Sequence, residues 1–527
     1  MVVQESGTPR ELEHHLRPST VKGIDFDQLL EPLAATAHGA ASKQPITGVS
    51  LNPQIVQPGD VFLAISGAKR HGAEFLDTAI ANGAVALITD EQGLNLLVEP
   101  TSIPVAVVSD VRKIAARAAS MVYGTAKNCP ELLAVTGTNG KTTTTFMIRA
   151  ITEALGSHAG LVGTIEMSAR GQIIPSVLTT PEATQLHGVL ARMDEEDISS
   201  VAMEVSSHSL SYGRVDGLQF AVSGYTNLTQ DHLDLHGSME EYFQTKAQLF
   251  TSDHSQRAVV MVDDLYGQRL ARNASIPTES LSLDADIDAD WHVVNIVPSV
   301  LGHQFTIVHR DGRELHARTG LPGLFNVANA ALATVMVLAS GVALEQLQEA
   351  LKQADPLSVS VPGRMQVIGE SPVAVVDFAH NSDAIAKALE SMRVTEQGRR
   401  IIVFGATGER DKTKRPDMGA VAARHADIVI VTDDDPHGED PAPIREQVAA
   451  GAQAVIDAER PAVQLFNIAP RAQAVEFAVS LAGVQDAILV AGRGHEVSQD
   501  VAGIDVELDD RVELANALKL HGFVTIY

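Results

Sequence analysis

A strand, a glycine-rich turn and a helix follow one another near residue 132, and no other feature constrains the fold as strongly. Residues 132–135 form an apolar strand that runs directly into Thr136-Gly137-Thr138-Asn139-Gly140-Lys141-Thr142-Thr143. In such a turn the backbone N–H groups surround phosphate oxygens, and the following helix adds its positive N-terminal dipole. Lys141 can reach the β- and γ-phosphates, and the Thr142 hydroxyl can ligate magnesium. The turn has two residues between its glycines where the Walker pattern has four, so the sequence predicts a shortened P-loop and leaves hydrolysis, group transfer and ligation open.

The rest of the chain alternates short apolar runs with helical patterns, which is typical of an α/β protein. Its 527 residues give room for about three domains. We expect them over 1–129, 130–361 and 362–527, with the first twenty or so residues loose. Expected strands are 61–65, 85–88 and 105–108, then 132–135, then 372–377, 401–404, 428–432 and 488–491. The last four indicate a mostly parallel sheet with helices on its faces.

A carboxylate, a histidine and a lysine in the second domain are candidate site residues. Glu204 ends an apolar stretch in the segment E-V-S-S-H, a position that suits either magnesium beside a nucleotide or a surface charge. His232 lies in the dense polar segment T-N-L-T-Q-D-H-L-D-L-H-G. Ser238 with Glu241 forms a capping box that marks the start of a helix. Lys246 falls on the apolar stripe of this helix, so it either snorkels to water or is a modified or ion-paired lysine turned toward the nucleotide.

Polar residues follow every strand expected in the third domain. These segments begin at Asp377, Gly405, Asp433 and Gly492. Because parallel strands end at the same edge of a sheet, the four segments should lie together. They predict a polar pocket with both signs of charge, suited to a zwitterionic ligand.

The charge balance excludes some classes of partner. Lys plus Arg is 39 and Asp plus Glu is 66, a formal net charge of -27, which argues against nucleic acids and acidic membranes as main partners. The single cysteine, Cys129, allows neither an intrachain disulfide nor a cysteine-based zinc site. The N-terminus lacks the apolar core of a signal peptide, and no long apolar run follows, so we expect a cytoplasmic protein without membrane insertion.

Taken together, the motifs resemble the Mur ligase family of bacterial cell-wall synthesis, and within it the members that add the third residue of the peptide stem. The loop G-T-N-G-K-T-T, E-V-S-S-H, D-H-L-D-L-H-G, the lysine helix, P-G-R-M and A-G-R-G-H-E occur in family order, between Ser50 and Glu496. The resemblance implies a small α/β UDP-binding domain, a central ATPase domain with a mostly parallel sheet, and a C-terminal Rossmann-like domain. It implies that ATP, UDP-MurNAc-L-Ala-D-Glu and a diamino acid give the tripeptide, ADP and phosphate through an acyl-phosphate. The partners would be these small molecules alone, and the protein a monomer.

The resemblance also assigns roles to residues. Lys141, Glu204, His232 and Lys246 would be catalytic; Thr142 and Glu204 would hold one magnesium ion, His232 with Glu204 a second, and Lys246 would become a carbamate that ligates magnesium. The ATP-binding positions would be Gly137, Thr138, Asn139, Gly140, Lys141, Thr142, Thr143, Asn326, Arg364 and Asp377. The nucleotide-sugar positions would be Ser50, Ala68, Lys69, Arg70, Thr179, Thr180, Ser206, Tyr212 and Arg214. Two of these depart from the family: Ser50 is flanked by valine and leucine where members commonly have Asp-Ser-Arg, and Tyr212 stands where some have glutamine.

The implied amino-acid pocket departs from the family in an informative way. Its positions would be Arg410, Asp434, Asp435, Pro436, His437, Gly492 and Glu496, with Arg410 on the α-carboxylate. Members that add diaminopimelate carry D-N-P-R here, and its arginine binds the far carboxylate; His437 lacks that bidentate fork. Asp435 replaces a neutral amide with a negative charge, which favours a terminal ammonium. We therefore expect L-lysine first, L-ornithine next and meso-diaminopimelate third.

Two other functions compete with this interpretation. Folylpolyglutamate synthase shares the P-loop and the ligation chemistry, but the developed N-terminal domain and the motifs at His437 and Glu496 argue against it. A P-loop regulatory protein that acts through conformation would have no use for a lysine placed as a magnesium-bridging carbamate.

Overall fold

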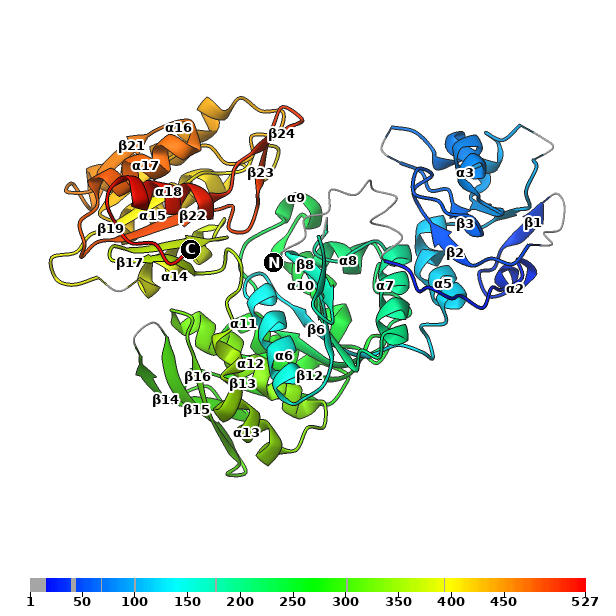
Figure 1. The fold of residues 1–527 in the computed structure, drawn as a ribbon, viewed down its shortest axis with the longest axis horizontal. Coiled ribbons are helices and arrows are strands. Elements are labelled where there is room, and N and C mark those ends of the chain that lie inside the picture. The colour runs from blue at the N-terminus through cyan, green and yellow to red at the C-terminus, as the bar shows by residue number, and fades with distance from the viewer. Residues whose placement is uncertain are drawn as a thin grey trace.

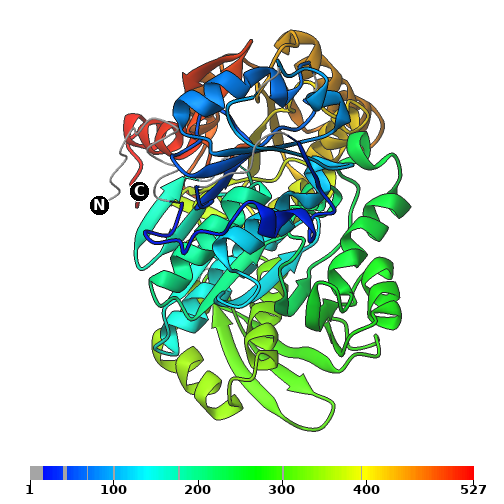
Figure 2. The same cartoon turned by 90° about the vertical axis from the view of Figure 1, so that its right-hand side faces the viewer.

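The computed structural model describes residues 16–38, 44–67, 69–98, 101–175, 178–299, 302–392 and 394–527. Three separate sheets, each packed with helices, form an N-terminal, a central and a C-terminal lobe (Figure 1). Figures 1 and 2 both place the N- and C-terminal lobes at one end of the central lobe. The last three strands of the central lobe, within residues 291–319, lie at its opposite end. The α/β architecture in three units is therefore confirmed.

The N-terminal lobe contains a five-stranded sheet in the order β1-β5-β4-β3-β2. β1 pairs antiparallel with β5, and the other neighbours are parallel. The strands are β1 (Thr36–His38), β2 (Gly48–Ser50), β3 (Asp60–Leu63), β4 (Ala86–Thr89) and β5 (Val105–Val107). The helices are α2 (Asp27–Leu30), α3 (Leu76–Asn82), α4 (Glu91–Leu94) and α5 (Val111–Tyr123).

The central lobe contains an eleven-stranded sheet in the order β16-β15-β14-β13-β12-β11-β6-β10-β7-β8-β9. The strands from β14 to β7 in this order are parallel, and antiparallel strands extend both ends. Its strands are β6 (Glu131–Thr136), β7 (Ala159–Val162), β8 (Glu166–Ala169), β9 (Gln172–Pro175), β10 (Ser200–Glu204), β11 (Phe220–Tyr225), β12 (Ser255–Met261), β13 (Thr278–Ser282), β14 (Trp291–Pro298), β15 (His303–His309) and β16 (Glu314–Thr319). Its helices are α6 (Lys141–Ala154), α7 (Ala183–Glu195), α8 (Ser207–Ser211), α9 (Leu233–His236), α10 (Met239–Ala247), α11 (Leu265–Asn273), α12 (Leu324–Ala339) and α13 (Leu344–Ala354). Because β11, β6 and β10 are parallel neighbours, their carboxyl ends bring Thr226, the P-loop and Glu204 together.

The C-terminal lobe contains a six-stranded sheet in the order β17-β18-β22-β19-β20-β21, parallel except for β17. Its strands are β17 (Gln366–Glu370), β18 (Val373–Asp377), β19 (Arg400–Phe404), β20 (Ile428–Val431), β21 (Gln464–Asn467) and β22 (Ala487–Ala491). Its helices are α14 (Ser382–Ser391), α15 (Lys414–His425), α16 (Pro441–Ala458), α17 (Arg471–Leu481) and α18 (Asp510–Leu520). A separate hairpin of β23 (Ser498–Val501) and β24 (Ile504–Glu507) follows the sheet.

All eight strands expected from the sequence are present, with small errors at their ends. Residues 64, 65, 85, 108, 372 and 432 lie just outside their strands. The four polar segments of the C-terminal lobe follow β18, β19, β20 and β22, so they share one sheet edge as predicted. Within the described ranges, no helix combines the length and apolarity needed to cross a bilayer.

Candidate active site

The phosphate loop is held in shape by the end of the neighbouring strand β11. Gly137 and Gly140 have positive φ angles of 145° and 93°. A Cβ on Gly137 would lie 1.8 Å from Thr226 Oγ1, and one on Gly140 would lie 2.4 Å from Asn329 Oδ1. Thr226 Oγ1 donates a hydrogen bond of 2.6 Å to the carbonyl of Asn139. The loop therefore requires glycine at both positions for conformational and steric reasons.

Lys141, the first residue of α6, is folded back onto this loop. Its Nζ donates hydrogen bonds to the carbonyl oxygens of Gly137 (3.0 Å) and Thr138 (2.9 Å). Burial lowers the pKa of Lys141, while nearby Glu204 opposes that change. The Lys141 ammonium therefore lies at the phosphate loop, where phosphate oxygens can replace the Gly137 and Thr138 carbonyls as its hydrogen-bond acceptors.

Glu204, at the end of β10, is 1% exposed and surrounded by hydroxyl and amide donors. Its Oε2 accepts hydrogen bonds from Thr142 Oγ1 (3.0 Å) and Thr164 Oγ1 (3.1 Å), and its Oε1 accepts one from Thr164 N (2.8 Å). A carboxylate beside the hydroxyl of a P-loop threonine is the hard oxygen donor set that magnesium prefers, so these two residues fit the ion. The described residues hold no cluster of three or more His, Cys, Asp or Glu side chains placed around a metal.

Lys246 on α10 points into the protein and not to water. It is 1% exposed, and its Nζ lies 2.9 Å from the Gly137 carbonyl and 4.7 Å from the centre of the Tyr242 ring. Burial, and secondarily Lys141, lowers the pKa of Lys246 well below its usual value. The snorkelling alternative is therefore wrong, and the lysine faces the nucleotide loop. The helix begins where predicted, because Ser238 Oγ accepts a hydrogen bond from Glu241 N.

His232 lies at the start of α9 with a positive φ of 53°. Its ring makes an edge contact with His208 at 5.0 Å between ring centres. The preceding residue, Asp231, is buried and faces the C-terminal lobe: its Oδ2 lies 3.5 Å from His380 Nε2, and its Oδ1 4.0 Å from Lys414 Nζ. Burial alone would raise the pKa of Asp231, but these cationic and imidazole neighbours lower it. The sequence analysis assigned no role to Asp231, although it forms this contact between lobes.

Two further groups of the C-terminal lobe reach the phosphate loop. Asn139 Nδ2 donates to Asp383 Oδ2 at 3.2 Å, and Arg364 donates to Thr142 Oγ1 at 3.4 Å. The Arg364 guanidinium also stacks over the Phe378 ring at 4.3 Å. The C-terminal lobe is thus docked on the loop.

The two remaining residues expected to bind ATP are engaged locally. Both oxygens of Asp377 accept backbone hydrogen bonds, from Met365 N (2.6 Å) and Ala379 N (2.8 Å), and burial raises the pKa of this carboxyl. Asn326 donates to the Pro322 carbonyl at 2.7 Å. Asp377 therefore shapes the chain beside Arg364.

A cavity of about 550 Å³ lies between the N-terminal and central lobes, and its lining includes Tyr212, one of the expected nucleotide-sugar residues. Tyr212 lines it, with the guanidinium of Arg112 5.3 Å and that of Arg214 5.6 Å from its ring centre. Arg214 also donates to the Thr180 carbonyl at 3.1 Å and to Glu182 at 2.7 Å. The sequence analysis missed Arg112, which lies on the other lobe and carries no motif.

Three of the other expected nucleotide-sugar residues lie beside Glu204 or directly after it. Thr179 Oγ1 accepts from Thr164 (3.0 Å), Thr180 Oγ1 donates to the Glu204 carbonyl (2.9 Å), and Ser206 caps α8. Ser50 is buried at the end of β2, and Lys69 and Arg70 are exposed, with Arg70 paired to Glu74. Ala68 lies outside the described residues.

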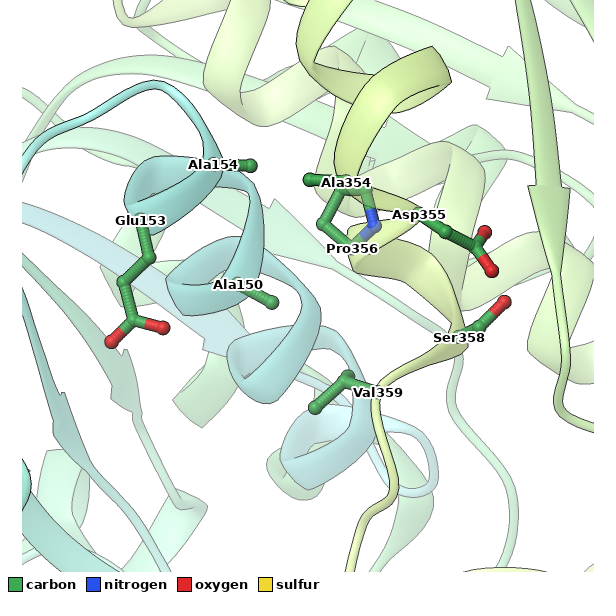
Figure 3. A pocket seen from close by; sticks show the side chains of 8 residues that line it. All are labelled: Ala150, Glu153, Ala154, Ala354, Asp355, Pro356, Ser358 and Val359. Atoms are coloured by element: carbon green, nitrogen blue, oxygen red, sulfur yellow. The ribbon is translucent and has the colours of Figure 1, made fainter.

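A second hollow lies on the central lobe between α6 and the segment after α13. Figure 3 shows the small side chains of Ala150 and Ala154 facing Ala354 and Pro356. Its charged lining residues are the acids Glu153 and Asp355. It offers no cation to a phosphate or carboxylate.

Most of the residues expected to form the amino-acid pocket lie together at the carboxyl ends of β20 and β22. Arg493, which is 0% exposed, pairs with Asp435, and its NH1 lies 3.7 Å from Glu496 Oε2. A Cβ on Gly492 would lie 2.6 Å from Asp434 Oδ2, so the two loops touch. Burial, then the nearby Asp434, raises the pKa of Glu496 to about 8, although Arg493 opposes the change. A second buried arginine, Arg471, lies near Asp434 and Glu496 and is paired with Asp510.

The remaining pocket residues differ in how firmly they are held. His437 has a positive φ of 50°, and its Nδ1 lies 2.7 Å from Asp500 Oδ2 on the β23–β24 hairpin. Pro436 is buried in the same loop. Arg410 is exposed and makes no hydrogen bond to another described residue, so nothing in the protein fixes its guanidinium. Sequence reasoning missed Arg493 and Asp500 as pocket residues.

Comparisons with known proteins agree with this architecture. Residues 45–130 match the model described as Mur ligase family, catalytic domain, residues 135–337 the Mur ligase middle domain, and residues 363–494 the Mur ligase, glutamate ligase domain. The UDP-N-acetylmuramoyl-L-alanyl-D-glutamate--2,6-diaminopimelate ligase of Streptomyces avermitilis is 40% identical over 95% of this chain and 98% of its own length. The UDP-N-acetylmuramyl-tripeptide synthetase of Leifsonia xyli is 38% identical over 97% of this chain and 98% of its own length. A solved UDP-N-acetylmuramoyl-L-alanyl-D-glutamate--2,6-diaminopimelate ligase is 29% identical, covers 95% of this chain and 100% of its own, and has a TM-score of 0.64.

Similarity over nearly the full length of both chains defines the protein as an ATP-dependent ligase that joins an acid to an amino acid. The chain belongs to the Mur ligase family. The resemblance seen in its motifs is confirmed.

Proposed function

We propose that this protein joins L-lysine to UDP-MurNAc-L-Ala-D-Glu at the expense of ATP, as a cytoplasmic step of peptidoglycan precursor synthesis. The observation that carries the choice of L-lysine is the acidic pocket at Asp435 and Glu496, with His437 where diaminopimelate-adding members have arginine. The domains would be those expected above: 1–129 for the UDP-sugar, 130–361 for ATP and 362–527 for the amino acid. The protein would act as a monomer.

In the first step the D-Glu carboxylate attacks the γ-phosphorus, and ADP leaves. The backbone N–H groups of residues 137–143 and the Lys141 ammonium would bind the phosphates, with Arg364 approaching from the C-terminal lobe. Thr142 and Glu204 would hold one magnesium ion, and His232 with Glu204 and the modified Lys246 a second. Magnesium, when bound, offsets charge on the transferring phosphoryl group. The lobes exclude water from the acyl-phosphate.

Lys246 would act as a carbamate. Addition of carbon dioxide requires a neutral amine, and burial beside Lys141 favours the neutral form of Lys246. The amine nitrogen bonds to the carbon of carbon dioxide, and one proton leaves to solvent. The product is an anion beside Lys141, in place of a neutral amine, and both lysine nitrogens lie within hydrogen-bond distance of the Gly137 carbonyl. Carbamylation therefore places a negative charge where the Lys141 ammonium attracts it.

In the second step the neutral α-amine of the diamino acid attacks the acyl carbon, and phosphate leaves from a tetrahedral intermediate. Thr179, Thr180, Ser206, Tyr212 and Arg214 would hold the sugar-peptide near Glu204. Arg410 would bind the α-carboxylate of the amino acid, and its freedom from internal hydrogen bonds leaves its fork available.

The charge of the pocket supports a cationic distal group. Two buried guanidinium groups lie near Asp434, Asp435 and Glu496: Arg493 pairs with Asp435, and Arg471 is already paired with Asp510. A second ammonium would lower the cost of ionising Glu496, whereas a second carboxylate would add to the repulsion. Meso-diaminopimelate, third in the order expected from the sequence, is the alternative that the comparisons favour, because relatives at about 40% identity carry 2,6-diaminopimelate in their names.

The test is phosphate release by the purified protein with ATP, magnesium and UDP-MurNAc-L-Ala-D-Glu, with L-lysine, L-ornithine or meso-diaminopimelate supplied separately. We expect the highest kcat/KM with L-lysine. The matched variant His437→Arg should lose lysine activity and gain diaminopimelate activity. Wild-type activity confined to diaminopimelate would overturn the substrate while keeping the ligase, and folate-stimulated release would favour a folylpolyglutamate synthase instead.

A further inference from the structure

The hairpin β23–β24 is attached to three residues of the expected amino-acid pocket, Asp434, Asp435 and His437. Gln499 Nε2 donates to the Asp434 carbonyl at 2.6 Å, and Asp500 N donates to Asp435 Oδ1 at 3.1 Å. His437 pairs with the strand through hydrogen bonds from His437 N to the Asp500 carbonyl (3.2 Å) and from Ala502 N to the His437 carbonyl (2.8 Å). The hairpin is therefore a wall of the pocket, although it lies outside the main sheet.

Asp500 is itself held in one orientation by two donors. Its Oδ1 accepts a hydrogen bond from Gly503 N at 2.8 Å, and its Oδ2 lies 2.7 Å from His437 Nδ1. The hydrogen bond from His437 is the main cause of a lowered pKa for Asp500, so this carboxyl is ionised at neutral pH. An ionised carboxylate accepts hydrogen bonds and cannot donate.

The proton on His437 follows from this contact. Because Asp500 can only accept, the proton of a neutral His437 ring must be on Nδ1, which leaves a lone pair on Nε2. Within the described part of the chain, Nε2 makes no hydrogen bond. An unprotonated ring nitrogen accepts a hydrogen bond from an ammonium but gives nothing to a carboxylate.

We propose that Asp500 is a specificity-determining positioning residue, which fixes the His437 tautomer so that Nε2 accepts a hydrogen bond from the distal ammonium of the diamino acid. This inference rests on the proposed function, since it concerns the same pocket. Asp500 lies outside the motifs from which the pocket was predicted. The inference also explains how His437 can favour an ammonium: with the proton on Nδ1, Nε2 accepts a hydrogen bond, whereas in the other tautomer Nε2 would donate one.

The first experiment measures steady-state kinetics of the full-length enzyme for wild type, Asp500→Asn and Asp500→Ala. The control is Asp505→Asn, which removes the same charge from the residue directly opposite on the hairpin. We expect KM for L-lysine to rise about tenfold in Asp500→Ala, as for loss of one hydrogen bond to a charged group, and to rise less in Asp500→Asn, whose amide oxygen can still accept from Nδ1. The kcat and the KM for ATP should stay near wild type, and Asp505→Asn should behave as wild type.

The second experiment observes the tautomer directly and does not depend on activity. Long-range proton–nitrogen NMR correlations of nitrogen-labelled histidine, with His437 assigned by its loss in His437→Gln, should show Nδ1 protonated and Nε2 unprotonated in the wild type. The opposite tautomer would overturn the inference. So would an Asp500→Ala variant whose KM for lysine matches that of Asp505→Asn in an enzyme that prefers lysine. If the wild-type enzyme uses only meso-diaminopimelate, both the proposed substrate and this inference are wrong. The comparison of the three diamino acids with the wild-type enzyme shows this before any variant is made.

Discussion

Binding of a cationic side chain beside Glu496 should release a proton. Burial and Asp434 raise the pKa of this carboxyl to about 8 in the empty pocket. At pH 7, about nine-tenths of such a group is protonated. An ammonium within a few ångströms favours the carboxylate and moves the pKa down. If it falls below about 5, binding of one L-lysine releases about 0.9 proton at pH 7 and about 0.1 at pH 9.

Isothermal titration calorimetry in buffers of different ionisation enthalpy measures this number directly. The titration uses enzyme saturated with a non-hydrolysable ATP analogue and UDP-MurNAc-L-Ala-D-Glu, so that the lobes are in the state that receives the amino acid. The slope of observed enthalpy against buffer ionisation enthalpy gives the protons released. Glu496→Gln should reduce the slope to near zero while retaining the shape of the side chain. Proton uptake, or a slope that Glu496→Gln leaves unchanged, would refute the charge argument for the pocket.

Three further predictions concern the rest of the site. Lys246→Arg should lower kcat about a hundredfold or more and abolish the carbamate signal obtained from carbon-13-labelled bicarbonate by NMR; retention of either would exclude the carbamate. Arg471→Met leaves the fully buried Asp510 without the partner that holds both its oxygens at 2.7 Å, so hydrogen exchange should report a local loss of about 3–5 kcal/mol in α17 and α18. Gly137→Ala should weaken binding of a fluorescent ATP analogue about tenfold or more, because its Cβ would lie 1.8 Å from Thr226 Oγ1, and unchanged affinity would show that the loop can move.

The sequence predicted those features that are determined by residues close together in the chain. Buried parallel strands are continuous apolar runs, so β6 and β22 could be recognised without their neighbours. Lys246 was conspicuous because a charge interrupted the apolar stripe of a helix, but the stripe left open whether its ammonium reaches water, and the structure shows it buried.

Contacts between distant residues could not be predicted in this way. Asp500 is 63 residues from His437 and lies on a short hairpin with an exposed second strand, so no periodicity marks it. Arg493 was visible within its motif, but only the tertiary structure shows that it is fully buried against Asp435. Arg112 reaches Tyr212 from another lobe, and nothing in either local sequence indicates that pairing.

The contacts between lobes suggest why nucleotide binding and closure should be coupled. Asn139 is a residue of the phosphate loop, and its side chain also bonds to Asp383 of the C-terminal lobe. Arg364 belongs to the C-terminal lobe and donates to Thr142, the hydroxyl expected to ligate magnesium. A ligand that changes the loop therefore acts on the same atoms that hold the lobes together. In the proposed mechanism the C-terminal lobe carries the amine and the acyl-phosphate forms on the central lobe, so binding of the nucleotide and the approach of the two reactants depend on the same contacts.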